Sequence, residues 1–151
     1  MHWFESQILT LYKLAEAYSL SKKQEGNDVL ILSEQGRQKR SEFIEAVQAL
    51  VNRVIHSPGV TACTAYHEGL ILAQSGKTPD IDALGAMIQE SIRVAQKGET
   101  ILHLGKIQQI VIVGDLNKIA MITIGPIILC VLSPKHTNLA LSLSEYNGEI
   151  V

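Results

Sequence analysis

Gly76-Lys77-Thr78 is the stretch of the sequence that comes nearest to a known chemical motif, because phosphate-binding loops end in the same three residue types. It lies between an apolar run and a predicted helix, where such a loop would be found. That loop also requires a glycine five positions earlier, and Ile71 stands there, whose side chain would keep backbone amides away from a phosphate. Pro79 removes one further amide donor. The pattern therefore predicts a plain loop before a capped helix.

Cys63 and His67 are four residues apart, a spacing that would bring a nucleophile and a base together on a helix. The surrounding residues favour a strand, where this separation corresponds to about 13 Å. The two side chains are therefore not expected to meet. Paired ligand spacing is also missing among the five histidines, and a structural zinc site normally needs four donors. The sequence predicts no catalytic residue, metal site or cofactor.

The residues that follow Thr78 predict a long helix. Thr78 is a suitable N-cap, Pro79 suits the first helical position, and Asp80 complements the positive end of the helix dipole. Apolar residues then recur every three or four positions, and Gly98 is expected to end the helix. The apolar stripe consists of Ile81, Leu84, Ile88, Ile92 and Ala95.

Five runs of residues favour extended structure. Two of them flank Gly69, whose access to positive φ suits a tight β-hairpin. The other three are joined by short turns, which make neighbouring strands antiparallel. The runs are residues 60–66, 70–73, 107–113, 118–124 and 127–132. Apolar residues occupy consecutive positions in 110–113 and 127–132, so we expect protein to cover both faces of these strands.

The two ends of the chain are less regular than its middle. Helical spacing of apolar residues predicts an amphipathic helix over residues 3–22, and residues 29–32 could form a short strand. A second helix is expected to begin at Ser41 as its N-cap. We therefore divide the chain into an N-terminal extension (1–38), a domain (39–146) and a tail (147–151). For residues 136–146 the pattern leaves helix and strand both open.

Composition and charge narrow the functional classes. Hydrophobic residues make up 46% of the chain and charged residues 19%, against roughly 25% charged in a typical soluble protein. This composition favours an apolar face that a partner covers. The formal net charge of −2 disfavours nucleic-acid binding. With no export signal and no apolar run of about 18 residues, we expect a cytoplasmic protein with free thiols and no membrane insertion.

From about residue 41 to residue 138, the order helix, hairpin, helix, three-stranded meander is similar to that of the roadblock family. This family contains dynein-associated light chains, lysosomal scaffold subunits and bacterial regulators of Ras-like GTPases. The residues that carry the likeness are Pro58-Gly59-Val60, Glu68-Gly69-Leu70, Leu104-Gly105-Lys106, Ile110-Val111-Ile112 and Asn138-Leu139. The family's long terminal helix is doubtful in this chain, and the N-terminal helix could take its place.

The resemblance implies an α/β (α+β) fold that is roadblock-like and profilin-like, with a five-stranded antiparallel sheet, the long helix on one face and the flanking helices on the other. It also places Cys130 on a strand beside that of Cys63. Homodimers or heterodimers are implied, formed by pairing of the third strands and packing of the long helices. An apolar edge strand would indeed favour aggregation unless a second subunit covered it. The implied interface residues are Leu84, Ile88, Ile92, Ile107, Ile110 and Ile112.

The function implied by the resemblance is that of a non-catalytic dimeric module that binds and regulates or scaffolds a small Ras-like GTPase. Its partners would be a second copy or a paralogous roadblock subunit, together with the GTPase. Arg53 and Arg93 are read as solvated helix residues rather than as catalytic arginines. The alternative is a small-molecule sensor of the profilin, PAS or GAF type, which needs an internal pocket. The scarcity of aromatic residues and the Ile-, Val- and Leu-rich strands favour a filled core instead.

Overall fold

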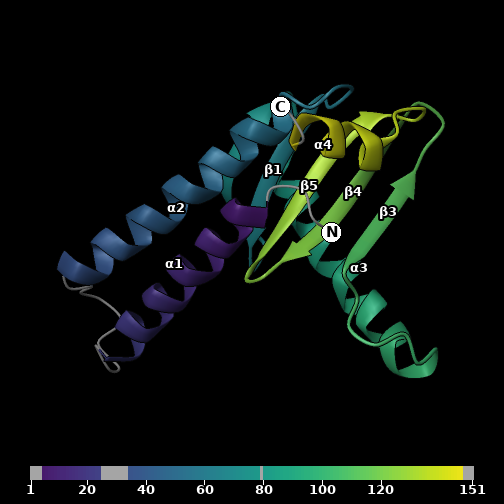
Figure 1. The fold of residues 1–151 in the computed structure, drawn as a ribbon. Helices are drawn as coiled ribbons and strands as arrows, with labels where there is room; N and C mark the ends of the chain where they lie inside the picture. Colours follow the sequence, from purple (N-terminus) through teal and green to yellow (C-terminus); the bar gives the residue numbers. More distant parts are fainter. Residues whose placement is uncertain (1–4, 25–33, 79, 148–151) are drawn as a thin grey trace.

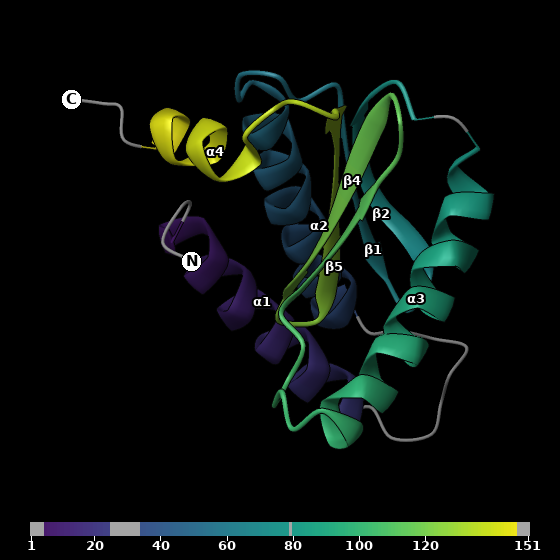
Figure 2. The same cartoon turned by 90° about the vertical axis from the view of Figure 1, so that its right-hand side faces the viewer.

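The chain forms one antiparallel sheet with helices on both faces (Figures 1 and 2). The computed structural model describes residues 5–24, 34–78 and 80–147. The elements, in chain order, are α1 (Glu5–Gln24), α2 (Glu34–Ile55), β1 (Ala62–His67), β2 (Leu70–Gly76), α3 (Ile81–Ile101), β3 (Gln109–Val113), β4 (Asn117–Ile124), β5 (Ile127–Pro134) and α4 (Leu139–Asn147). The strand order is β2-β1-β5-β4-β3, and every neighbouring pair is antiparallel. The predicted fold class is confirmed.

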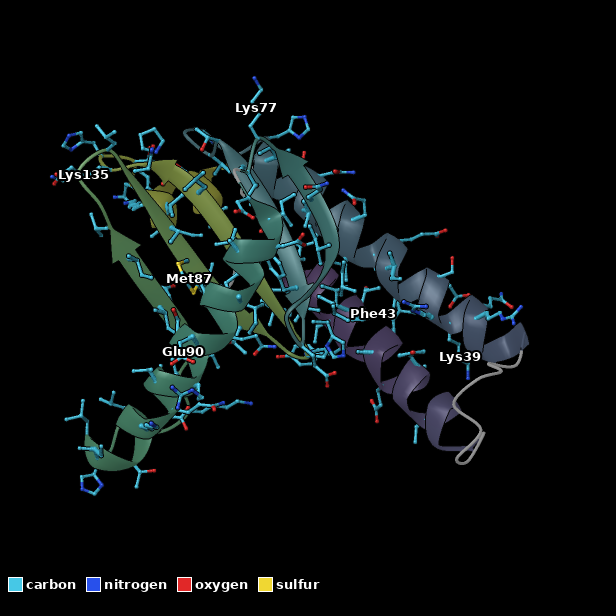
Figure 3. All side chains as sticks on the ribbon, turned by 180° about the vertical axis from the view of Figure 1, so that it is seen from behind. Lys39, Phe43, Lys77, Met87, Glu90 and Lys135 are labelled. Atoms are coloured by element: carbon cyan, nitrogen blue, oxygen red, sulfur yellow. The ribbon has the colours of Figure 1, made fainter. Side chains whose placement is uncertain are left out.

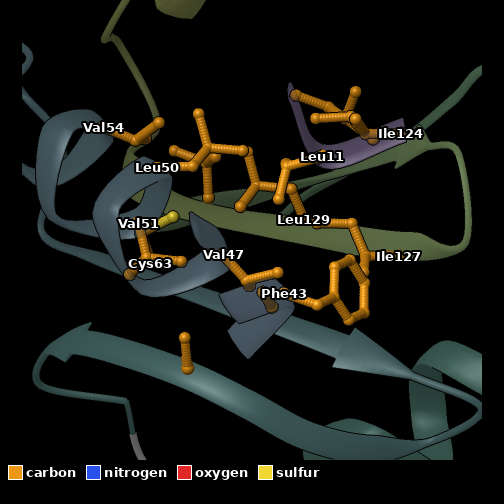
Figure 4. Packing of buried hydrophobic residues seen from close by; sticks show 14 of the residues in the cluster. Leu11, Phe43, Val47, Leu50, Val51, Val54, Cys63, Ile124, Ile127 and Leu129 are labelled. Atoms are coloured by element: carbon orange, nitrogen blue, oxygen red, sulfur yellow. The ribbon is translucent and has the colours of Figure 1, made fainter. Parts of the chain in front are cut away.

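The helices are distributed unequally between the two faces. α3 lies alone on one face, whereas α1, α2 and α4 lie on the other (Figure 2). The larger core lies beneath α1 and α2, and Figure 4 shows α2 side chains packed against β5 and against Leu11 of α1. The apolar residues of α2 that recur at spacings of four, three and four are almost fully buried, as helical periodicity predicts. These residues are Phe43, Val47, Leu50 and Val54.

α2 begins earlier than the sequence predicted. It starts at Glu34, so Ser41 is an exposed residue within the helix and not its N-cap. The segment from Glu34 to Arg40 is rich in Glu, Gln, Arg and Lys, which have good helix propensity, and α1 packs alongside α2. The boundary expected between residues 38 and 39 therefore falls inside α2, while the possible strand 29–32 lies outside the described residues.

α1 packs on the sheet and on α2. Its Leu11 is 1% exposed and Ala15 9% exposed, and both belong to the larger core. The Tyr12 hydroxyl oxygen also accepts a hydrogen bond from the backbone N–H of Gly125, in the turn between β4 and β5, over 3.0 Å. The expected N-terminal extension therefore contributes directly to the core.

Both ends of α3 differ from the prediction. Asp80, not Thr78, is the N-cap: its side-chain oxygen accepts a hydrogen bond from the N–H of Ala83 over 3.1 Å. The helix passes through Gly98 and ends at Ile101. An interior glycine costs about 1 kcal/mol relative to alanine, which lowers helix stability without ending the helix.

A helix closes the fold, which settles the choice left open for residues 136–146. α4 begins after Asn138, whose side chain accepts a hydrogen bond from the N–H of Leu141 over 3.1 Å. Leu143 is buried and Leu139 packs beside it in the larger core, as a spacing of four on a helix allows. α4 has nine residues. α1 lies on the same face of the sheet as α4 (Figure 1).

Candidate interaction surface

The outer edge of β3 is an exposed part of the sheet that carries apolar residues. β3 ends the strand order, and no other described strand pairs with its outer side. Burial of both faces was expected for β3 and for β5, and it is correct only for β5, which lies inside the sheet. In β3, Val111, Ile112 and Val113 are 44%, 42% and 57% exposed. A single chain therefore leaves this edge uncovered.

α3 carries a second apolar stripe beside the one that faces its core. Met87, Val94 and Ile101 are spaced by seven residues, so they share one side of the helix, and they are 41%, 54% and 72% exposed. The end of α3 extends past the sheet (Figure 3). Ile112 belongs to the α3 side of the sheet, because its cross-strand partner Ile119 packs in the core beneath α3. We define the α3–β3 surface as Met87, Val94, Ile101, Leu102, Leu104 and Ile112, most of which are largely exposed.

Of the six residues expected at an interface, Ile112 alone lies on the α3–β3 surface. Ile88 is 1% exposed and packs in the core beneath α3 with Tyr66, Met121 and Cys130, because the stripe predicted for contact with a partner is the one that attaches α3 to its own sheet. The same core takes in three more of the six as partly buried residues. They are Leu84, Ile92 and Ile110.

Ile107 lies on the opposite side of the sheet, next to Ile8 and Ile122. Met87, Val94 and Ile101, which were not among the six expected residues, recur every seven positions on the exposed side of α3.

The first half of α3 is held closely against the β1–β2 hairpin. A Cβ atom added at Gly85 would lie 2.8 Å from the carbonyl oxygen of Gly69, so only glycine fits at this crossing. The buried Tyr66 hydroxyl donates a hydrogen bond to the carbonyl oxygen of Ile81 over 3.1 Å. Burial also raises the pKa of Tyr66, which keeps this donor protonated. α3 is thus fixed at its start, while its end extends beyond the sheet.

Glu99 connects the end of α3 to the beginning of β3. Its carboxylate accepts a hydrogen bond from the N–H of Ile107 over 2.8 Å. Between these residues the backbone turns through His103 and Gly105, which both have positive φ. This contact orders the segment that carries Leu102 and Leu104.

Glu90 and Arg93 form an exposed ion pair one turn apart on α3. Hydrogen bonds from Arg93 lower the pKa of the Glu90 carboxyl. Both groups remain charged near neutral pH, so the outer side of α3 offers a mixed polar surface beside the apolar stripe. An exposed pair of this kind contributes little to folding stability.

Gly76 is the last residue of β2, and Lys77 and Thr78 lie between β2 and α3, as the sequence indicated. Gly76 has φ +81°, and a Cβ there would be 2.3 Å from the carbonyl oxygen of Thr61, so the glycine is required by the backbone turn. The hydroxyl of Thr78 is buried and has no hydrogen-bond partner within the described part of the chain. It borders a cavity of about 90 Å³ beneath the start of α3.

Cys63 and Cys130 lie on neighbouring strands but on opposite faces of the sheet. Cys63 belongs to the core beneath α2, and Cys130 to the core beneath α3, where its cross-strand partner is Thr64. Burial raises the pKa of both thiols, that of Cys130 to about 12.

His67 lies at the end of β1, where its Nδ1 is 2.9 Å from the carbonyl oxygen of Pro126. Among the residues with described positions, no three His, Cys, Asp or Glu side chains are grouped to hold a metal ion.

Within the described ranges, no helix combines the length and apolar character needed to cross a membrane.

No family model matches the sequence, and no curated protein matches it.

Solved structures do match the fold. A roadblock/LC7 domain from Streptomyces avermitilis is 19% identical with a TM-score of 0.55, over 64% of this chain and 85% of that one. MglB from Myxococcus xanthus is 13% identical with a TM-score of 0.61, over 69% and 84%. A structure of MglB with tetrameric arrangement is 15% identical with a TM-score of 0.61, over 68% and 80%. At these identities the likeness is one of fold, and the chain has a roadblock-like fold.

Proposed function

We propose that this chain is a non-catalytic dimeric module, and that the dimer binds and regulates or scaffolds a small Ras-like GTPase. The observation that carries the proposal is the α3–β3 surface, where an apolar helical stripe continues onto an apolar, unpaired strand edge. Isolated exposed apolar residues are common, whereas a contiguous patch of them marks a contact with another molecule. The roadblock-like fold and the sequence resemblance to roadblock proteins support the same function.

Pairing of β3 with the β3 of a second copy would complete this surface. The free backbone N–H and C=O groups along the edge would gain partners, which is the strongest physical reason for a strand edge to associate. The end of α3 extends past its own sheet, so Val94 and Ile101 would lie against the second subunit. The structure of MglB with tetrameric arrangement is an example of self-association on a similar fold.

Charge placed on the α3–β3 surface tests the dimer. The variant Val94→Lys/Ile112→Lys should be monomeric by light scattering at concentrations where the wild-type chain is a dimer. Val94 is 54% exposed and Ile112 42% exposed, so the fold should persist, as circular dichroism would show. Leu70→Lys, at an exposed position on the far side of the sheet, is the matched control and should remain dimeric. A monomeric wild-type chain, or a double variant with unchanged mass, would refute the dimer.

The joined α3 helices would provide the platform for the GTPase. A platform shifts the partner's nucleotide cycle if it binds one switch-loop conformation more tightly than the other, and that difference in affinity sets the size of the shift. On this face Glu90 and Arg93 supply charge beside the apolar stripe. Both side chains are more than half exposed and can reach a polar partner surface.

Binding of the GTPase can be tested separately from dimer formation. Ras-like GTPases from the same source, loaded with a non-hydrolysable GTP analogue or with GDP, should be retained on the immobilised wild-type dimer in one nucleotide state. Arg93→Glu should reduce this binding at least tenfold without changing the dimer mass. Lys39→Glu, with the same charge change far away on α2 (Figure 3), should not. Equal binding by all three proteins, or retention of no GTPase by the dimer, would contradict the GTPase role.

A small-molecule sensor receives less support from the structure. The cavity between α3 and the sheet measures about 90 Å³ and the hollow beside α1 about 250 Å³, and both are smaller than the about 300–1,000 Å³ usual for small-ligand pockets. The packed side chains beneath α2 likewise fit a filled core (Figure 4).

A further inference from the structure

The residue pattern on the exposed side of α3 is centred on Val94. Met87 lies seven residues before Val94 and Ile101 seven residues after it, and all three are exposed. Two charged residues flank the same centre: Glu90 precedes it by four residues and Lys97 follows it by three, and both are exposed. Residues three, four or seven apart share one side of a helix. The same side of α3 therefore carries an apolar stripe, an acidic group before its centre and a basic group after it.

A dimer paired through β3, as proposed above, determines how two α3 helices meet. A twofold axis normal to the sheet makes the paired strands antiparallel, and it makes the two α3 helices antiparallel as well, because α3 lies along the sheet (Figure 2). If this pair is centred on Val94, Met87 faces Ile101 of the second copy. Glu90 then lies about 1.5 Å along the helix axis from Lys97 of the second copy, at the usual rise per residue.

Charge distinguishes this register from its neighbours. The apolar stripes also face each other when the centre of the pair moves by about 3.5 residues in either direction. A centre near Glu90 brings the two Glu90 carboxylates together, and a centre near Lys97 brings the two Lys97 ammonium groups together. Like charges at such positions repel, whereas the register centred on Val94 gives two Glu90–Lys97 pairs related by the twofold axis. The exposed side of α3 therefore complements itself in this register.

Small residues lie where the two helices would come closest in this register. Ser91 precedes Val94 by three residues and Gly98 follows it by four, so Ser91 would face Gly98 of the second copy. A Cβ atom added at Gly98 would meet nothing within 4 Å in the rest of the described chain. Packing within the chain thus gives no reason for a residue that costs a helix about 1 kcal/mol relative to alanine. A second helix packed closely at Gly98 supplies that reason, because the side chains at a contact set the distance between helices.

Glu90 can take part in this contact while it remains bonded to Arg93. Its carboxylate accepts hydrogen bonds from the Arg93 guanidinium, and the two oxygens of a carboxylate together offer about four lone-pair sites. Arg93 itself lies about 100° around the helix from Val94, since one turn takes about 3.6 residues. Arg93 is therefore left at the outer side of α3 in the dimer, where the GTPase would bind.

We propose that Glu90 and Lys97 select an identical chain as the partner at the α3–β3 surface and fix the register of the two α3 helices at Val94. The proposal rests on the dimer proposed above and adds to it the choice of partner. A paralogous chain with another order of charges on its long helix would place like charges, or no charge, opposite these two residues.

A charge exchange between two variants tests this selection. Glu90→Lys gives each α3 two basic groups at these positions and Lys97→Glu gives it two acidic groups, so each variant alone should dimerise about tenfold more weakly than the wild type. Mixed in equal amounts, the two variants should form heterodimers as about nine in ten of all dimers, in place of the statistical half. Native mass spectrometry measures this fraction when one variant carries a tag. The double variant Glu90→Lys/Lys97→Glu restores both pairs and should dimerise within about threefold of the wild type.

A matched pair of variants on α2 supplies the control. Glu42→Lys and Lys39→Glu make the same charge changes on the other face of the sheet (Figure 3), and their mixture should give the statistical half. If the mixture of Glu90→Lys and Lys97→Glu also gives the statistical half, or if the double variant dimerises as weakly as the single ones, the register is wrong while the dimer stands. A monomeric wild-type chain overturns both.

Discussion

The two faces of the sheet differ in how completely one chain covers them. Among the described side chains, sixteen buried residues form a core beneath α1 and α2 to which both helices and the sheet contribute, whereas four lie beneath α3. The first face is covered except along β3, where Val111 and Val113 are exposed, and the second leaves Met87, Val94 and Ile101 in solvent. One face therefore supports the fold, and the other is available for contact with another chain.

The two cysteines provide one chemical probe for each face of the sheet. Their protection from a thiol reagent is the largest effect that we expect. In single-thiol variants, native Cys63 (with Cys130→Ala) and native Cys130 (with Cys63→Ala) should react with a disulfide reagent at pH 8 roughly 1,000-fold more slowly than in urea, because both thiols are buried with raised pKa values. Cys130, under the thinner cover of α3, should react faster than Cys63. Dimer formation at higher protein concentration should slow Cys130 alone. Equal rates at both positions would remove the difference between the faces.

The same thiols predict how stability depends on pH. Their pKa values are raised in the folded state, so the unfolded chain releases these protons first as the pH rises. Their contribution to stability is complete below about pH 8 and is lost above about pH 9, by up to about 1.4 kcal/mol per pH unit for each thiol. Urea titrations of the wild type and Cys130→Ala at pH 8 and pH 10 measure the loss. The variant should lose less stability than the wild type over this interval.

Truncation of the larger core should cost the most folding free energy. Leu50 is fully buried beneath α2, so Leu50→Ala should lower the free energy of unfolding by about 3–5 kcal/mol. Urea denaturation monitored by circular dichroism measures it. Leu141→Ala, at an exposed position on α4, should change stability by less than about 0.5 kcal/mol. Similar losses for both variants would mean that α2 does not carry this core.

Leu11→Ala tests whether α1 is part of the same core. Leu11 is 1% exposed, and its truncation should cost about 2–4 kcal/mol in a single cooperative transition. Leu20→Ala, on the same helix at a position 53% exposed, should cost less than about 0.5 kcal/mol. If Leu11→Ala were equally mild, α1 would be a separate appendage, as the expected boundary near residue 38 implied.

The sequence predicted the elements well where one stripe or one alternation dominated. The stripe of α2 is in this class, because burial on a single face imposes a clear period. The strands were recognised from their apolar runs and from the turns between them. Helix ends were predicted less well. Ser41 and Thr78 are both good N-caps by residue type, but neither caps its helix. α2, which packs against α1, already begins at Glu34. α3 begins after Asp80, whose side chain accepts a hydrogen bond from the N–H of Ala83.

The burial of the α3 residues was harder to predict for a physical reason. α3 carries two apolar stripes, and the denser one, which includes Ile88 and Ile92, was assigned to the partner. A helix that is apolar on two sides uses the denser stripe for its own core, and the sequence alone does not reveal which side faces the sheet. The two cysteines lie on adjacent strands, as the resemblance implied, and the register places Cys130 opposite Thr64, on the other face of the sheet from Cys63.

The smallest expected effect concerns the polar contact of α1. Tyr12→Phe removes the hydroxyl that accepts the Gly125 N–H and keeps the ring, which lies against Gly125. Because Tyr12 is 47% exposed, water can replace the lost acceptor, and the cost should be about 0.5–1 kcal/mol, measured by urea denaturation. This is well below the cost expected for Leu11→Ala one residue away. A loss of similar size in both variants would mean that α1 is held by its hydrogen bond as much as by burial, and the α1 side would then resemble the α3 side, where Tyr66 is similarly bonded to Ile81.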